Sequence, residues 1–435
     1  MAGAASASSR GYALTRPMRF MITIRPIPLA LVPTDSQAAA RISAPNYDEF
    51  QGDREIWELL RANPDSVLRV TMAHCDTAGA DEIGVADSPD SLARAVVSMG
   101  SLRSGSLTRE VAGILFVYEI TGPSRPDVRQ IGLGGMASTK EIRTDARPTG
   151  PIIRNEGVRM PKARGRAQLI EATGTIIGTV NNAVPDQDGR LASALESYAD
   201  AHAATYQTRD HHRNLHRIWL IDQADDITAL QELVAAQPEA YVADGNHRSA
   251  AAAMLGYDHF LAIFFTVDRM GIAPYNRLVR GPVPTVGEPR KALAGSFVVT
   301  EVPQEAGPFQ PTATHEVGLY TSGSGWLRLI PRPGSFDASD AARSIDHDIV
   351  QRRFIGELLG IADPGDDRLI FVGANKDAGW LQRRVDEGAM VYAVTLPAVT
   401  MKQFIEVCRQ GGMMPTKSTW FEPKIRSGLV MALLD

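Results

Sequence analysis

The sequence predicts a mixed α/β protein of the α+β kind, and its composition, its alternating elements and its length support that class. Hydrophobic residues make up 44% of the 435 residues and charged residues 22%, the balance of a globular protein. Short apolar runs alternate with helical stretches through the middle of the chain, as in an α/β layer. This length is sufficient for two or three domains.

The first structured region is expected to be an α/β unit over residues 21–150. The run MITIRPIP at its start predicts a strand that prolines end. Its further expected elements are a helix over 55–62, a strand over 66–73, a helix over 91–100 that ends at a glycine, and a buried strand over 113–120.

Two more regions are expected, over 151–270 and 271–435. In the first, the expected elements are helices over 191–204, 227–236 and 246–255 and strands over 217–221, 240–243 and 260–266. In the second, they are strand-like pieces near its start, helices over 346–358, 379–386 and 400–410, and a strand over 390–396.

Residues 1–20 are small, polar and basic without any acid, and they lack the apolar core of a secretion signal. We expect a disordered N-terminal extension, with a transit peptide as the alternative. Cys75 and Cys408 fit no metal or redox spacing and are expected to be reduced thiols. We therefore expect a cytoplasmic protein.

The overall charge and hydropathy limit the classes of partner that the protein can have. The net charge of −5 argues against a general nucleic-acid binder, and no apolar run is long enough for a membrane helix. We expect a small-molecule substrate, no nucleic acid and no membrane. The sequence leaves the oligomeric state open, with a homodimer among the alternatives.

Two further motifs do not predict a functional site. GLGGMA, residues 132–137, matches G-x-G-x-x-G/A, but no apolar helix follows it, so we expect a turn between strands and not a dinucleotide site. RDHHRNLHR, residues 209–217, lacks acids or cysteines at zinc-ligand spacing, and we expect a solvated basic segment.

The stretch YVADGNHRSAAAAMLG places polar residues at the mouth of a helix. Gly245 allows a sharp turn, and the free N–H groups of the following helix favour an anion. Asn246, His247 and Arg248 add donors for a phosphate. Asp244 would be repelled by a phosphate unless it holds a cation, which indicates Mg²⁺. The alternative is that Asp244 only caps the helix and Arg248 only pairs with it.

The chain resembles the domain of unknown function 1015 family over roughly residues 21–434. Within the wider ParB/sulfiredoxin-like superfamily, its helix mouth also resembles the D-G-H-H-R motif of free serine kinases. The blocks that carry the resemblance are IRPIP…ISAPNYDEF, ANPDSVLRV, IIRNEGVRMPKARGR, HRIWLI, ADGNHR and GGMMPTKSTWFEPKIRSGLV. The resemblance implies a ParB/sulfiredoxin-like nucleotide-binding core over 151–270, with added N- and C-terminal α/β regions.

The same resemblance implies a kinase that phosphorylates the hydroxyl of a small free amino acid, with L-serine first, from ATP or ADP with Mg²⁺. It places the catalytic base on Glu156. It places the Mg²⁺ ligand on Asp244, and the phosphates on Gly245 to Arg248. Such residue types fit phosphoryl transfer, which needs mostly positioning and charge neutralisation.

Other residues are weaker candidates for contact with the nucleotide or the substrate. Lys162 and Arg166 are expected to neutralise nucleotide charge. The candidates for substrate contact are Arg154, Arg277, Lys417 and Ser418. For the closing block that contains Lys417 and Ser418, the alternative is that it only holds a terminal loop against the core.

The chain departs from the kinase motifs at several positions. Asn155 and Asn246 stand where imidazoles are usual, Val158 replaces a threonine, and Gly165 replaces an aspartate before Arg166. We expect free serine to be a poor substrate or a related hydroxy compound to be preferred. Two other functions remain open: a nucleotide-binding regulatory or DNA-associated module, and a nucleotide phosphohydrolase.

Overall fold

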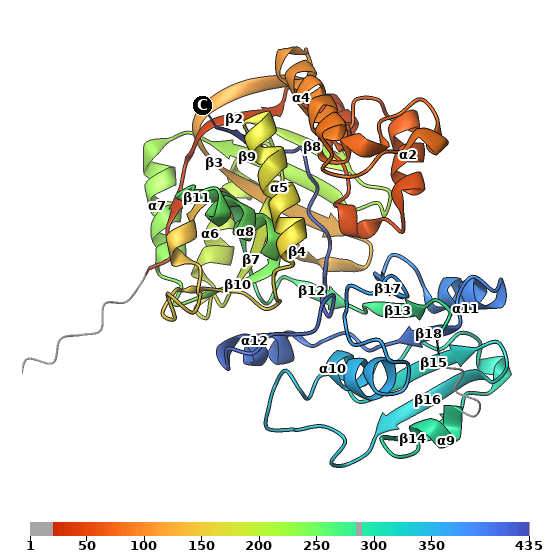
Figure 1. The fold of residues 1–435 in the computed structure, drawn as a ribbon. Coiled ribbons are helices and arrows are strands. Elements are labelled where there is room, and N and C mark those ends of the chain that lie inside the picture. The colour runs from red at the N-terminus through yellow and green to blue at the C-terminus, as the bar shows by residue number, and fades with distance from the viewer. Residues whose placement is uncertain (1–20, 284–288, 435) are drawn as a thin grey trace, which may run out of the picture.

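The computed structural model describes residues 21–283 and 289–434, so the extension expected over 1–20 lies outside the described residues. The chain forms a large body around one sheet and a small body around another (Figure 1). Helices and several sheets together confirm the predicted mixed α/β class.

The large sheet has twelve strands among the described residues. These are β1 (Ile24–Arg25), β2 (Ile27–Pro33), β3 (Thr108–Gly122), β4 (Arg125–Ser138), β5 (Ile152–Ile153), β6 (Thr175–Ile176), β7 (Val180–Val184), β8 (Tyr206–Arg209), β9 (Leu215–Ile221), β10 (Ala240–Asp244), β11 (His259–Thr266) and β20 (Met431–Leu433). The main path runs β5-β10-β7-β11-β4-β3-β2-β20-β6. Strands β3 and β4, before residue 150, pair with β9 and β11, after it, so the regions expected over 21–150 and 151–270 share one sheet.

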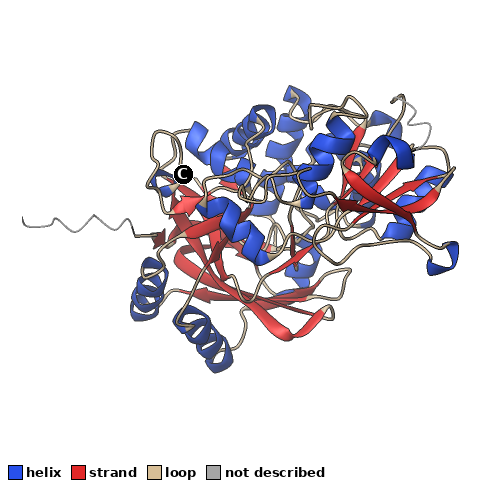
Figure 2. Ribbon diagram, turned by 90° about the horizontal axis from the view of Figure 1, so that it is seen from below, coloured by secondary structure: helices blue, strands red, loops and turns tan. Residues whose placement is uncertain are grey.

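Helices cover both faces of the large sheet (Figure 2). They are α1 (Ser36–Ile42), α2 (Asp53–Ala62), α3 (Leu68–Thr71), α4 (Pro89–Ser104), α5 (Met160–Thr173), α6 (Arg190–Ala201), α7 (Ala224–Ala235) and α8 (Asn246–Met254). Alternation along β3 explains the two cores: Phe116 packs with α5 and α8 residues on one face, and Leu115 packs with α6 and α7 residues on the other.

The strand expected over 66–73 is wrong. The segment forms α3 and a 3₁₀ turn over Ala73–Cys75 instead. The Leu68 N–H donates to the Ser66 hydroxyl (3.3 Å), which favours a turn at the start of the segment. Val67, Leu68 and Val70 are all buried among residues of the neighbouring helices, so helical packing overrides the strand-like alternation.

The turn expected over 132–137 is also wrong, because GLGGMA lies inside β4. A Cβ at Gly134 would lie only 2.0 Å from the Phe116 ring, so glycine lets a neighbouring aromatic side chain pack on the strand. The prediction of a solvated basic segment over 209–217 is wrong at His216. This side chain is fully buried, with its Nδ1 2.8 Å from the Tyr118 hydroxyl and its Nε2 3.2 Å from Asp210.

The small body is built on a six-stranded antiparallel sheet, ordered β14-β16-β15-β18-β13-β17. Its strands are β13 (Asn276–Val279), β14 (Phe297–Glu301), β15 (Val317–Thr321), β16 (Gly325–Pro331), β17 (Leu369–Val372) and β18 (Tyr392–Thr395). The remaining helices are α9 (Pro289–Leu293), α10 (Asp346–Val350), α11 (Ala378–Asp386) and α12 (Met401–Arg409). None of the described helices is both long and apolar enough to cross a bilayer.

The C-terminal segment joins the two bodies. After α12 the chain returns to the large body, where β20 inserts between β2 and β6 (Figure 1). On the way, β19 (Trp420–Glu422) pairs with β12 (Gly271–Ala273) in a separate two-stranded ladder. Residues 411–430 therefore lie where they can contribute side chains to a site between the bodies.

Candidate active site

A charged cavity opens where β10 ends and α8 begins. Four stretches of chain supply its walls: the loop after α1, the segment before α5 with α5 itself, the β10–α8 junction, and the C-terminal segment. The lining residues are Tyr47, Asp48, Glu156, Arg166, Ala243, Asp244, Gly245, Asn246, His247, Arg248, Lys417, Thr419 and Lys424.

The β10–α8 junction requires its glycine. Gly245 has φ of 111°, and a Cβ there would lie 3.1 Å from both the Val180 Cα and the Arg248 Nε. Arg248 donates to Asp244 Oδ1 (2.8 Å) and to the Thr179 carbonyl oxygen. Asp244 pairs with Arg248 and does not cap α8, because the N-cap residue is Gly245. Of the alternative interpretation, the ion pair between Asp244 and Arg248 is present and the helix cap by Asp244 is not.

Asp48 is the residue that sequence reasoning missed. Its Oδ2 lies 3.2 Å from Lys424 Nζ and 3.4 Å from Lys417 Nζ, and Lys424 also lies 3.5 Å from Asp244 Oδ2. Burial opposes ionisation, yet the Lys424 and Lys417 ammonium groups hold the pKa of Asp48 well below its usual range. Asp48 and Lys424 both belong to blocks that carry the family resemblance, and this was the available signal.

The two carboxylates fit a divalent cation. Asp48 Oδ1 is buried without a hydrogen-bond partner among the described residues, so one oxygen is available as a ligand. Asp244 faces the same ammonium group, that of Lys424, from the end of β10. Carboxylate oxygens beside phosphates are the usual protein ligands of Mg²⁺.

Glu156 also lines the cavity. Burial raises the pKa of its carboxyl, although the nearby Lys417 ammonium opposes the shift. The Lys417 N–H lies 3.4 Å from Glu156 Oε2. Lys417 has φ of 59°, an uncommon value for a residue with a side chain, and its ammonium lies over the rings of Tyr47 (5.4 Å) and Tyr275 (5.5 Å).

Asn155 and Asn246 are hydrogen-bond partners. Asn246 Nδ2 donates to Asn155 Oδ1 (2.9 Å), and both residues are buried. The pair connects the start of α8 to the segment that carries Glu156. The two asparagines are therefore one coupled feature of the site.

His247 fastens α8 to α5. Its Nε2 accepts from the Arg159 N–H (3.0 Å), and burial together with Lys162 lowers the pKa of the imidazole to about 4. Lys162 and Arg166, both on α5, lie 5.4 Å and 4.8 Å from the ring centre of Tyr47. Of these two cations, Arg166 lines the cavity and Lys162 does not.

Three predicted substrate residues do not line the cavity: Arg154, Arg277 and Ser418. Arg277 is buried and donates to the carbonyl oxygens of Tyr275, Asn276 and Thr416, and the Ser418 hydroxyl donates to Pro415 (2.7 Å). These contacts hold the 415–418 turn. Lys417, by contrast, extends from that turn into the cavity.

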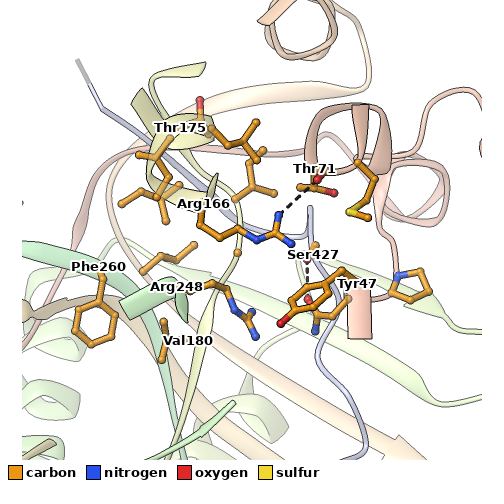
Figure 3. Close-up of a pocket in the computed structure, with 17 residues that line it drawn as sticks. Tyr47, Thr71, Arg166, Thr175, Val180, Arg248, Phe260 and Ser427 are labelled. Carbon is orange, nitrogen blue, oxygen red and sulfur yellow. Dashed lines mark hydrogen bonds between the residues drawn. The ribbon is translucent and has the colours of Figure 1, made fainter. Parts of the chain in front are cut away.

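A second, mainly apolar pocket adjoins the charged cavity (Figure 3). Tyr47, Arg166 and Arg248 line both spaces, so the two pockets are neighbours that share these side chains. The apolar pocket is otherwise lined by Pro45, Asn46, Thr71, Met72, Leu169, Ile170, Thr175, Ile176, Ile177, Gly178, Val180, Phe260, Leu261 and Ser427.

A polar cavity lies on the other side of Lys424. Acidic, basic and amide groups line it together, among them Glu49, Asn375 and Arg426. Burial and the adjacent Asp48 carboxylate raise the pKa of Glu49 to about 7. The charged cavity thus lies between an apolar pocket and a polar one, and shares lining residues with each.

Fold and site together define a mixed α/β protein with a charged cavity at a helix mouth. The chain belongs to the family described as proteins of unknown function (DUF1015), whose model matches residues 24–352. No curated protein matches the chain.

Solved structures similar to the chain include a free serine kinase in complex with AMP, with 12% identity, 62% of this chain and 83% of that chain covered, and a TM-score of 0.35. A conserved hypothetical protein from Pyrococcus furiosus has 12% identity, coverage of 63% and 89%, and a TM-score of 0.34. SbnI with a C-terminal truncation, from Staphylococcus aureus, has 11% identity, coverage of 66% and 82%, and a TM-score of 0.36.

Proposed function

We propose that the protein is a phosphotransferase that moves a phosphoryl group from ATP or ADP to the hydroxyl of a small free amino acid. One observation carries the proposal. A single cavity combines a carboxyl of raised pKa, Glu156, with the Asp48–Lys424–Asp244 cluster at a helix mouth. A base and a phosphate cradle in one space are what phosphoryl transfer to a hydroxyl requires.

The donor nucleotide would occupy the two neighbouring spaces. The N–H groups at the start of α8, with Lys417 and Lys424, offer donors and positive charge to the phosphates. The apolar pocket beyond Tyr47 and Arg166 is suited to the nucleobase of the donor, which it would bury against aliphatic side chains. In this arrangement Arg248 lies at the junction of the two spaces.

Asp48 and Asp244 are the residues that would hold Mg²⁺. When bound, the ion supplies charge neutralisation on the phosphate oxygens. Lys424 faces the same two carboxylates and would turn its ammonium toward the phosphates as they enter.

Glu156 takes the acceptor proton in this proposal. As the hydroxyl oxygen forms its bond to the terminal phosphorus, Glu156 accepts the hydroxyl proton, and the bond to the leaving nucleotide oxygen breaks. The Lys417 ammonium is placed to balance charge on the transferred group. L-serine is the first acceptor to test because of the motif resemblance, and the buried Asn155–Asn246 pair favours a related hydroxy compound as the second.

The test is incubation of the full-length protein with ATP or ADP, Mg²⁺ and single amino acids, followed by phosphorus NMR. We expect a new phosphomonoester signal that requires an amino acid bearing a hydroxyl. Alanine in place of serine is the matched control. Inorganic phosphate released equally with and without an acceptor would contradict the proposal and indicate a phosphohydrolase.

A further inference from the structure

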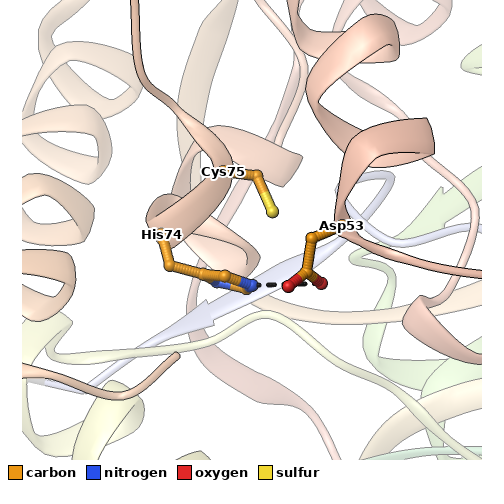
Figure 4. Close-up of side chains that lie close together, drawn as sticks. All are labelled: Asp53, His74 and Cys75. Atoms are coloured by element: carbon orange, nitrogen blue, oxygen red, sulfur yellow. Dashed lines mark ion pairs between the residues drawn. The ribbon is translucent and has the colours of Figure 1, made fainter. Parts of the chain in front are cut away.

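Three side chains with metal-binding atoms meet outside the charged cavity (Figure 4). Asp53 begins α2, and His74 and Cys75 lie on the 3₁₀ turn after α3. One potential ligand atom from each lies within 4.8 Å of the other two. None of the three lines the charged cavity or the apolar pocket. We propose that Asp53, His74 and Cys75 bind a zinc ion.

The distances suit zinc after small side-chain movements. Zinc holds nitrogen and oxygen at about 2.0–2.2 Å and sulfur at about 2.3 Å, so tetrahedral ligand atoms lie roughly 3.3–3.8 Å apart. His74 Nε2 and Asp53 Oδ1 are already 3.4 Å apart. The Asp53 side chain is 53% exposed, which gives its carboxylate room to adjust and the ion a way in.

The donor set matches zinc in kind and in charge. A thiolate and an imidazole favour Zn²⁺ over Mg²⁺, which prefers oxygen ligands. One thiolate and one carboxylate neutralise the two charges of the ion. Three protein ligands leave the fourth tetrahedral position for water or another donor.

The turn that carries two of the ligands is held in place by its backbone. The Gly84 N–H donates to the His74 carbonyl oxygen (3.0 Å), and Arg94 Nε donates to that of Ala73 (3.0 Å). Cys75 is fully buried beneath the turn. With this pair held in place, only the half-exposed Asp53 side chain has to adjust to complete the site.

The position links two walls of the proposed nucleotide site. Asp53 follows five residues after Asp48 of the charged cavity, and His74 follows directly after the Thr71–Ala73 stretch, whose first two residues line the apolar pocket. A zinc ion would tie α2 to the turn after α3 and so fix both walls. The spacing of the cysteines does not predict this site, because the third ligand, Asp53, lies 21 residues before His74 in the sequence.

The test is metal titration of the full-length protein after treatment with a chelator. Co²⁺ serves as the probe, because a thiolate bound to Co²⁺ absorbs in the near ultraviolet, whereas the Asp48–Asp244 carboxylates give no such band. We expect one equivalent of Co²⁺ to produce this band and Zn²⁺ to displace it. Cys408→Ser, which removes the other buried thiol, should leave the band unchanged.

Two variants should change the titration. Cys75→Ser should abolish the band, and Asp53→Asn should weaken Zn²⁺ binding by at least about tenfold, as loss of a metal ligand does. Asp53 is half exposed, so its variant keeps the test valid if Cys75→Ser fails to fold. The absence of a thiolate band in the wild type, or an equal band in Cys75→Ser, would overturn the proposal and leave only an Asp53–His74 pair beside a structural thiol.

Discussion

Glu156 is the residue on which the proposed chemistry depends most directly. Glu156→Gln keeps the size of the side chain and its contact with the Lys417 N–H but removes the base. We expect nucleotide affinity to be retained and turnover to fall about 10²–10⁴-fold, the usual contribution of a general base. Glu141→Gln is the matched control, because Glu141 is also a carboxyl of raised pKa but bonds to Thr23, outside the cavity. Equal turnover of Glu156→Gln and wild type would remove Glu156 from the mechanism.

The pH profile gives a second measurement on the same residue. The base works only when ionised, and burial raises the pKa of Glu156 above its ordinary value of 4.5. We therefore expect kcat/KM to rise with pH through a limb that lies above 4.5. The limb should vanish in Glu156→Gln, and a profile that falls with rising pH over this range would contradict the assignment.

Asn155 and Asn246 are expected to act as one unit. Removal of either amide leaves the other buried without its partner, which costs about 1–3 kcal/mol. The double variant Asn155→Ala/Asn246→Ala should therefore lose less stability than the sum of the two single variants, with an interaction energy of about 0.5–3 kcal/mol. Urea unfolding of the four proteins measures this energy. Additive losses would mean that the two amides are independent.

Glu49 should make stability depend on pH. Its pKa is raised to about 7 in the folded protein, so the folded state holds the proton more tightly than the unfolded chain. The contribution of Glu49 to the free energy of unfolding is therefore greatest below about pH 4.5 and is lost as pH rises to 7, by about 3 kcal/mol at 1.36 kcal/mol per pKa unit.

Glu49→Gln tests this dependence, because Gln retains an acceptor for the Asn46 N–H that Glu49 binds. Urea unfolding at pH 5 and pH 8 should show a smaller loss of stability in the variant than in the wild type. The same loss in both proteins would assign the pH dependence to other groups.

At the scale of elements, the β10–α8 junction carries both structure and proposed binding. Arg248 pairs with Asp244 and binds the Thr179 carbonyl oxygen while it lines both pockets. Arg248→Ala should weaken nucleotide binding by about 1.5–3 kcal/mol, the worth of a hydrogen bond to a charged group, and should also lower stability. Calorimetric titration with ADP and urea unfolding separate the two effects. Lost stability with unchanged affinity would show that Arg248 only pairs with Asp244.

Local sequence predicted these elements unevenly. The Asp-Gly junction between an apolar run and an alanine-rich helix was predicted well, because turn chemistry and helix propensity act within a few residues. The helix in place of the strand over 66–73 was not predicted, since burial among distant helices decides it. Gly134 was misread as a turn residue for the same reason, because its role depends on Phe116 from another strand.

At the scale of the whole molecule, charge argues against a role on DNA. Proteins that bind DNA through its phosphates lose affinity steeply with salt, and this chain carries a net charge of −5. We expect no retention of a DNA duplex at physiological salt in an electrophoretic mobility assay. Tight, salt-sensitive binding would favour the DNA-associated module over the phosphotransferase.

The sequence by itself determined the α/β class and the strand-to-helix junction at Gly245, because each depends on neighbours along the chain. The candidate Glu156 came from the family resemblance. Only the tertiary structure brought Asp48 and Lys424 to Asp244 from nearly 200 residues away on either side, and turned Arg277 inward to hold a loop. The physical reason is that Coulombic pairing and burial depend on distance in space. The return of the C-terminal segment to β20 sets those distances.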